Sequence, residues 1–188
     1  MVDFGYKGKV FSVLALCAVL SLASCASRYN FAVGLSDELA QYYGIYPSLE
    51  ADLALVIDSE ADSIKAAGVD TYFEPGNSIR QKLVPWTMFF SDESIETARL
   101  VEYDDHWFAW LEKNPTQFLL IVNLPPVAPA AAPPAGAAPP PAPSDPRMIL
   151  VPMDKNFFIQ DAFFKIEPAK ISKVNVAPET PKPENKGK

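Results

Sequence analysis

The sequence predicts a mainly β fold, an antiparallel β-sandwich with two short helices. Several apolar segments of strand length are separated by turn signals, and they lack the regular alternation with helices that a parallel α/β fold requires. With 188 residues, 49% of them hydrophobic, the chain can form one packed core but hardly two. We therefore expect a single sandwich domain over residues 48–176.

The first half of this domain is expected to contain a strand, a helix and a second strand. Residues 48–57 alternate between apolar and polar side chains, which is typical of a strand with one buried face. Ser59 and Asp62 indicate the start of a helix, and Gly68 can end it. A Glu-Pro-Gly-Asn turn then precedes residues 86–90, whose alternating aromatic pattern predicts another strand.

The second half is expected to contain a helix and at least three strands. Residues 106–113 carry tryptophans at helical spacing and are followed by an Asn-Pro stop. Residues 116–124 are apolar on both faces, which predicts an interior strand, and residues 147–153 resume the apolar pattern. The Pro/Ala-rich block 125–146 is expected to be a disordered insertion that joins these two strands as an overlong hairpin loop. A last strand is expected near residues 171–176.

The segments on either side of this domain are predicted to lie outside its core. Residues 25–47 show no clear period and are expected to form a tether, with a short helix possible over residues 37–43. Residues 177–188 are charged and rich in proline, so we expect a disordered tail.

The N-terminus resembles a bacterial export signal. Lys7 and Lys9 precede an uncharged apolar run over residues 10–22, which has the charge order of a secretory signal peptide and is too short to span a bilayer. The run ends in the four residues Leu22, Ala23, Ser24 and Cys25. This sequence resembles the lipobox of bacterial lipoproteins, in which a signal peptidase recognises the three residues before a cysteine that carries the lipid.

The lipobox implies the location of the mature protein. Residues 1–24 would be removed as a lipoprotein signal peptide, and a lipid on Cys25 would attach the chain to a membrane. Cys17 lies in the removed segment, so the mature monomer would have no disulfide. The residue after the cysteine is Ala26 and not an aspartate, as in lipoproteins that are passed on to the outer membrane. This resemblance favours the periplasmic side of the outer membrane. The alternative is a plain signal peptide with an incidental cysteine.

Composition argues against several classes of function. The net charge of -7 and the pI near 4.7 do not suit a nucleic-acid-binding protein, so nucleic acid is not an expected partner. His106 is the only histidine, and it is expected to lie in the first turn of a helix. The chain has no Gly-x-Ser-x-Gly motif, phosphate-binding glycine loop or paired-cysteine motif. We therefore expect no catalytic residues, no cofactor and no metal.

The three tryptophans leave one alternative function open. Trp86, Trp107 and Trp110 could form an aromatic platform for a glycan or another small ligand, in which case the chain would be a lipid-anchored binding module. Packing of these side chains in the core is the more ordinary expectation. Burial of the indoles distinguishes the two.

The layout of the chain resembles the outer-membrane lipoproteins of type VI secretion systems. The shared features are the lipobox at residues 22–25, a short tether, one strand-rich domain of this size and a long loop. The resemblance implies a transthyretin-like sandwich in the periplasm and a loop that grips an inner-membrane partner. The expected function is therefore a structural component of an envelope-spanning complex, held to the membrane by its N-terminal lipid and bound to another envelope protein.

Overall fold

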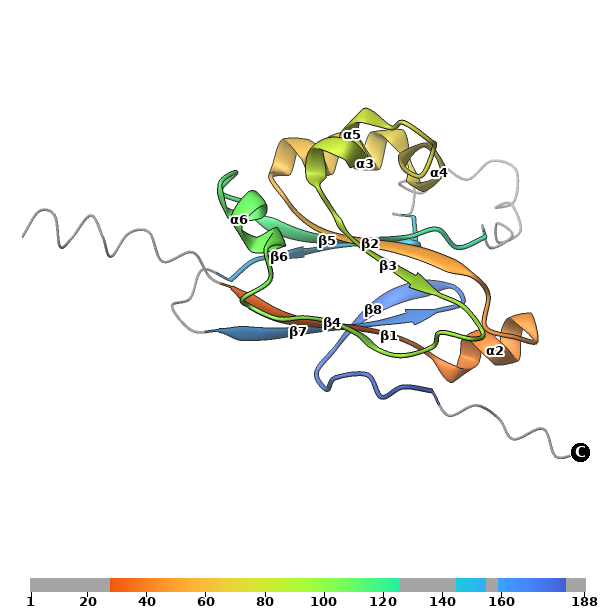
Figure 1. Cartoon of the computed structure of the whole chain (residues 1–188). Helices are drawn as coiled ribbons and strands as arrows, with labels where there is room; N and C mark the ends of the chain where they lie inside the picture. The colour runs from red at the N-terminus through yellow and green to blue at the C-terminus, as the bar shows by residue number, and fades with distance from the viewer. Residues whose placement is uncertain (1–27, 126–144, 155–158, 182–188) are drawn as a thin grey trace, which may run out of the picture.

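The protein is a two-sheet sandwich with a layer of helices on one side (Figure 1). The computed structural model describes residues 28–125, 145–154 and 159–181. The strands in these residues are β1 (Tyr29–Leu35), β2 (Leu49–Val56), β3 (Trp86–Phe90), β4 (Ala98–Leu100), β5 (Gln117–Val122), β6 (Met148–Pro152), β7 (Gln160–Glu167) and β8 (Lys170–Val174). The helices are α2 (Asp37–Tyr43), α3 (Asp58–Ala67), α4 (Val69–Tyr72), α5 (Ser78–Leu83) and α6 (His106–Leu111).

Within the described ranges, each sheet contains four strands. The first sheet has the order β4-β1-β7-β8 and the second has the order β3-β2-β5-β6. The predicted mainly β sandwich is confirmed. One detail differs from the prediction, because β1 and β7 are parallel, with Tyr29 opposite Gln160, so the first sheet is mixed. These two strands are far apart in the sequence, and no tight turn forces them to run in opposite directions.

Most of the predicted elements are present. The strand predicted over residues 48–57 is β2, the strand over 86–90 is β3, and the interior strand over 116–124 is β5. The helix expected to begin at Ser59 begins one residue earlier, at Asp58. The backbone N–H of Ile57, just before the helix, donates a hydrogen bond to the Glu60 carboxylate at 3.2 Å. Helices α4 and α5 were not predicted, since helices of four and six residues carry little periodic signal.

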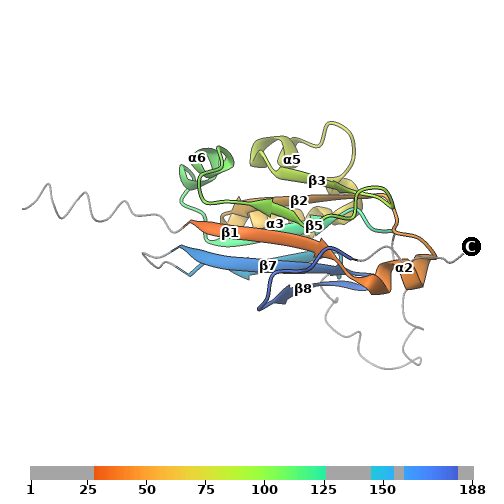
Figure 2. The same cartoon turned by 60° about the horizontal axis from the view of Figure 1, so that its bottom comes forward.

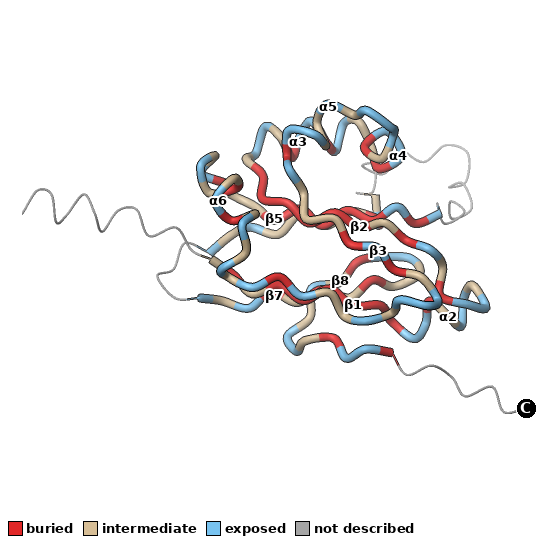
Figure 3. The backbone as a smooth tube through the Cα atoms, viewed as in Figure 1, coloured by how far each residue is buried: buried red, intermediate tan, exposed pale blue. Residues whose placement is uncertain are grey.

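The second sheet is buried on both faces at its two central strands, β2 and β5. Its inner face packs on the first sheet, and its outer face is covered by α3, α4 and α5, as the red and tan tube in Figure 3 shows. Two separate apolar clusters result, one on each face. The inner cluster includes Leu53, Leu55, Phe118 and Leu120, and the outer one includes Ala54, Val56, Leu119 and Ile121. This two-sided burial explains why β5 is apolar at consecutive positions.

The predicted tether over residues 25–47 is wrong for most of its length. Residues 29–35 form β1, an interior strand of the first sheet, so the folded domain begins at Tyr29 instead of residue 48. Large apolar side chains do alternate along β1, but the residues between them, such as Ala32 and Gly34, are small and buried instead of charged, so the pattern has little contrast and the strand was missed. The helix considered over residues 37–43 is confirmed as α2.

The predicted disordered tail is also wrong in its first part. Residues 177–181 pack against the first sheet, where Pro178 and Pro181 are buried and the Thr97 hydroxyl donates to the Pro178 carbonyl oxygen at 3.0 Å. Proline rings supply apolar surface although the segment forms no helix or strand. Residues 182–188 lie outside the described residues, as does most of the Pro/Ala block. The strands beside that block, β5 and β6, pair antiparallel as predicted.

The contact between this C-terminal segment and β1 requires a glycine. A Cβ atom at Gly34 would lie 2.5 Å from Cβ of Pro178, although the backbone of Gly34 does not have a positive φ. We predict that Gly34→Ala lowers the free energy of unfolding by about 1–3 kcal/mol, as overpacking typically does, and raises hydrogen exchange over residues 177–181. Pro178→Gly in the same background should restore part of the loss. Unchanged unfolding and exchange in Gly34→Ala would contradict this packing.

Candidate functional site

The predicted lipidation site lies just before the first strand. Leu22, Ala23, Ser24 and Cys25 are outside the described residues, and Tyr29 already belongs to β1. Four residues of extended chain span at most about 14 Å. A lipid on Cys25 would therefore hold this end of the sandwich close to a bilayer. None of the helices that the structure describes is both long and apolar enough to cross a membrane.

The tryptophans do not form the aromatic platform considered from the sequence. Trp107 and Trp110 are fully buried in the central core, and Trp86 is partly buried against it. Both α6 indoles are satisfied by backbone acceptors. Trp107 Nε1 donates to the Val101 carbonyl oxygen at 2.9 Å, and Trp110 Nε1 donates to the Val84 carbonyl oxygen at 3.0 Å. The side chains that could have bound a ligand are therefore part of the packing.

These two indoles fix the position of α6. The ring of Trp107 stacks on Phe31 of β1 with a centroid distance of 5.7 Å, and it meets the ring of Trp110 edge to face at 5.6 Å. Phe108 lies between them in the sequence and is 62% exposed, because it points away from the core. The helix thus presents one aromatic ring outward from a firmly packed base.

His106 lies in the first turn of α6, as expected from the sequence. Its backbone N–H donates to the Asp104 carboxylate at 3.0 Å, and its ring nitrogen Nδ1 contacts the same oxygen. Burial alone would raise the pKa of Asp104, but the bonds to His106 lower it below its ordinary value. In the described part of the chain, no group of three or more His, Cys, Asp or Glu side chains is placed to hold a metal ion.

A buried ion pair joins the helical layer to the second sheet. Asp52 of β2 is fully buried beneath this layer and accepts hydrogen bonds from Arg80 Nε at 2.7 Å and Tyr72 OH at 3.0 Å. The Thr87 hydroxyl donates to the same carboxylate at 2.7 Å. Arg80 also pairs with Glu50. Helix α4, helix α5 and strand β3 thus each supply one partner to the buried carboxylate.

The protonation of these groups fits a structural role. Burial and the adjacent Asp52 carboxylate raise the pKa of Tyr72 well above its ordinary value, so the phenol stays protonated and donates. Burial by itself would lower the pKa of Arg80, but hydrogen bonds to Asp52 and Glu50 raise it above its ordinary value. Neither group is therefore poised to exchange protons near neutral pH.

A second cluster of ion pairs links the ends of β5 and β6 to helix α4. Arg147 is 7% exposed, and its guanidinium bonds to Asp70 at 2.7 Å, to Asp145 at 2.8 Å and to the Leu124 carbonyl oxygen at 3.2 Å. The hydrogen bond from Arg147 lowers the pKa of Asp70 below its ordinary value. Because Leu124 and Asp145 flank the Pro/Ala block, Arg147 holds the base of that insertion together.

The buried pair at Asp52 gives a direct prediction. Asp52→Ala removes the carboxylate and leaves the guanidinium of Arg80 with only Glu50, so we expect the free energy of unfolding to fall by roughly 3 kcal/mol in chemical denaturation. As a control, Asp62→Ala breaks an exposed pair with Lys65 and should change stability by no more than about 0.5 kcal/mol. Equal effects of the two substitutions would contradict the assigned role of Asp52.

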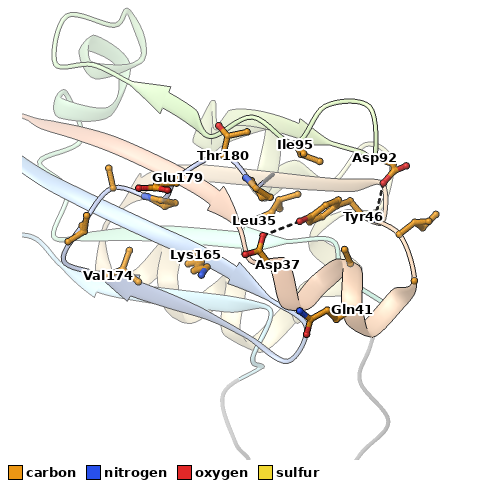
Figure 4. A pocket seen from close by; sticks show the side chains of 17 residues that line it. Leu35, Asp37, Gln41, Tyr46, Asp92, Ile95, Lys165, Val174, Glu179 and Thr180 are labelled. Atoms are coloured by element: carbon orange, nitrogen blue, oxygen red, sulfur yellow. Dashed lines mark hydrogen bonds between the residues drawn. The ribbon is translucent and has the colours of Figure 1, made fainter. Parts of the chain in front are cut away.

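A groove lies at the far end of β1, between α2 and the C-terminal segment (Figure 4). Its volume is about 950 Å³. Leu35 and Tyr46 form part of its lining, and Figure 4 shows the phenol of Tyr46 pointing toward Asp37, which accepts its hydrogen bond at 3.3 Å. The backbone N–H of Tyr46 donates to Asp92 at 3.3 Å. No sequence pattern indicated this groove, because its walls come from four segments that lie far apart in the chain, within residues 35–46, 92–95, at 165 and within 174–181.

The groove combines apolar surface with an excess of negative charge. The charged side chains among its lining residues are Asp37, Asp92, Lys165 and Glu179. Ile45 beside α2 is 57% exposed and adds apolar surface at the rim. A groove with three carboxylates and one ammonium group is electrostatically complementary to a basic segment of a partner protein.

Comparison with known proteins gives no match to a family model and no match to a curated protein. Among solved structures, the chain is similar to Lip of Serratia marcescens, described as a membrane-bound component of the type VI secretion system, with 10% identity, a TM-score of 0.47, and coverage of 80% of this chain and 99% of that one. The type VI lipoprotein TssJ1 of Pseudomonas aeruginosa gives 10% identity, a TM-score of 0.47, and coverage of 81% and 99%. A chain of a type VI membrane complex gives 8% identity, a TM-score of 0.49, and coverage of 79% and 98%.

Proposed function

We propose that this chain is a lipid-anchored, non-enzymatic component of an envelope-spanning protein complex, of the kind that type VI secretion systems build. Its place would be the periplasmic side of the bacterial outer membrane. The observation that carries the proposal is that β1, an interior strand, begins four residues after Cys25 of the lipobox. A lipid at that cysteine would fix the whole folded domain at the membrane surface, with little free chain between them.

The orientation that follows leaves the groove free for a partner. β1 runs from the lipid-proximal end at Tyr29 to Leu35, which lines the groove, and a seven-residue strand is about 20 Å long. Figure 1 shows the start of β1 and helix α2 at opposite ends of the sandwich. A domain held by its N-terminal end would thus direct the groove away from the bilayer, toward proteins that reach across the periplasm.

Membrane confinement makes a weak groove contact sufficient for assembly. Two molecules held in the same envelope have a high effective concentration toward each other, so modest affinity gives stable association. The acidic groove favours a basic, partly apolar segment of the partner, and electrostatic attraction would speed its capture. The rival function, ligand binding by a tryptophan platform, is not part of the proposal because Trp107 and Trp110 are buried.

The test is affinity capture of the lipidated protein from detergent-solubilised membranes, followed by mass spectrometry. We expect an envelope protein to co-purify with the parent chain. Glu179→Lys and Gln41→Lys reverse or add charge at exposed groove positions, and each should lower its recovery about tenfold. Glu38→Lys is the matched control, because Glu38 is exposed on the same helix and does not line the groove.

Two results would contradict the proposed function. One is the absence of any envelope protein above background with the parent chain. The other is an equal loss of the partner in Glu38→Lys and in the two groove variants, because this would indicate a general effect of added positive charge and would not locate the contact in the groove.

A further inference from the structure

We propose that the end of the sandwich where β1 and β7 begin and β4 ends is a membrane-contact surface, with the side chains of Tyr103 and Phe108 placed in the interfacial zone of the bilayer. The occupant of this surface is the lipid bilayer itself. The inference rests on the proposed lipid anchor at Cys25 and adds the face of the domain that meets the membrane.

Strand register brings the members of this surface together. β1 and β7 are parallel and begin opposite each other, at Tyr29 and Gln160, so Ile159 lies at the start of β1. β4 is antiparallel to β1, with Leu100 opposite Phe31, so the chain after β4 emerges at the same end. Figure 1 and Figure 2 both show α6 at this end and α2 at the other. The exposed apolar side chains gathered here are Val101 (52%), Tyr103 (76%), Phe108 (62%) and Ile159 (54%).

Arg28 ties the incoming chain to this surface. Its Nη1 donates to the Glu102 carbonyl oxygen at 3.2 Å, and its guanidinium lies over the ring of Phe108 at 5.5 Å from the centroid. Its own carbonyl oxygen accepts from the Gln160 N–H at 3.3 Å. The first residue that the structure describes is therefore bound to the loop after β4, to α6 and to the start of β7.

The short distance to Cys25 identifies what covers the surface. Arg28 is three residues after the cysteine, and three residues reach at most about 11 Å. The polar headgroup layer of a bilayer is itself about 5–8 Å thick on each side. A lipid on Cys25 would thus leave no room to hold Arg28 and its neighbours far from the headgroups, whereas the exposed side chains at the α2 end would stay in water.

The side chains suit a bilayer of neutral lipids. Tyrosine and phenylalanine gain from the membrane interface, where an aromatic ring leaves water while polar atoms remain hydrated. Phe108 is also presented by a rigid base, because Trp107 and Trp110 are buried beneath it. Among the described residues, the charged and titratable groups near this surface are Arg28, Glu102, Asp104, Asp105, His106, Asp154 and Asp161. This excess of carboxylates disfavours anionic lipids and favours zwitterionic headgroups.

The experiment places a fluorophore at single cysteines in the mature lipidated protein, reconstituted in phosphatidylcholine vesicles that contain a spin-labelled quencher lipid. The test variants are Tyr103→Cys and Phe108→Cys. The matched controls are Tyr42→Cys and Phe89→Cys, since these aromatic residues are 62% and 70% exposed and lie at the α2 end. We expect about twofold quenching at positions 103 and 108 and almost none at positions 42 and 89, as interfacial burial of the first pair requires.

Intact mass separates a failure of this inference from a failure of the proposed function. If Cys25 carries its acyl chains and all four positions are quenched equally or not at all, the membrane-contact surface is refuted and the anchor stands. If the acyl mass is missing, both are refuted. Replacing part of the phosphatidylcholine with phosphatidylglycerol should reduce quenching at positions 103 and 108, and an increase would overturn the preference for zwitterionic lipids.

Discussion

The position of β1 is the constraint on which the rest of the account depends. This strand lies between β4 and β7 in the first sheet, is buried on both faces, and begins at the fourth residue after Cys25. An interior strand cannot leave its sheet without breaking two ladders of backbone hydrogen bonds. The N-terminal end of the domain is therefore fixed in the fold itself, and any lipid at Cys25 would act on a rigid body with one end toward the bilayer.

The two-sided burial of the second sheet gives that body its rigidity. One face of β2 and β5 packs on the first sheet and the other on α3, α4 and α5. Asp52 is the exception within the outer interface, and its charge is matched there by Arg80 and by two hydroxyl donors. A buried carboxylate with several hydrogen-bond donors defines the position of the helical layer on the sheet more specifically than apolar contact alone. Compared with a well-packed apolar core, it adds little net stability.

The sequence predicted those strands and helices whose residues follow a clear strand or helical pattern. Apolar and polar residues alternate in β2, β3 alternates its aromatic residues, and the tryptophans of α6 have helical spacing, so each of these patterns is visible in the sequence. β1 was missed because the residues between its large apolar side chains, Ala32 and Gly34 among them, are small instead of charged, so its alternation has little contrast. Asp52 is one of the polar residues in the alternating segment 48–57, and a polar residue on that face looks the same in the sequence whether it meets water or a layer of helices. Pro178 was assigned to a disordered tail because proline composition does not reveal where a segment can pack. The groove was hidden for a related reason, since its walls meet only in the folded protein.

The proposed function depends most directly on a lipid on Cys25 that holds the folded domain at the membrane. The measurement is fractionation of cells that produce the parent chain or Cys25→Ser, with an alkaline wash of the membranes and the intact mass of the purified mature protein. We expect the parent to stay with the washed membranes, to begin at Cys25 and to carry acyl chains, whereas Cys25→Ser is recovered in the soluble fraction. Retention of Cys25→Ser in the washed membranes, or a parent chain that keeps residues 1–24, would contradict the proposed function.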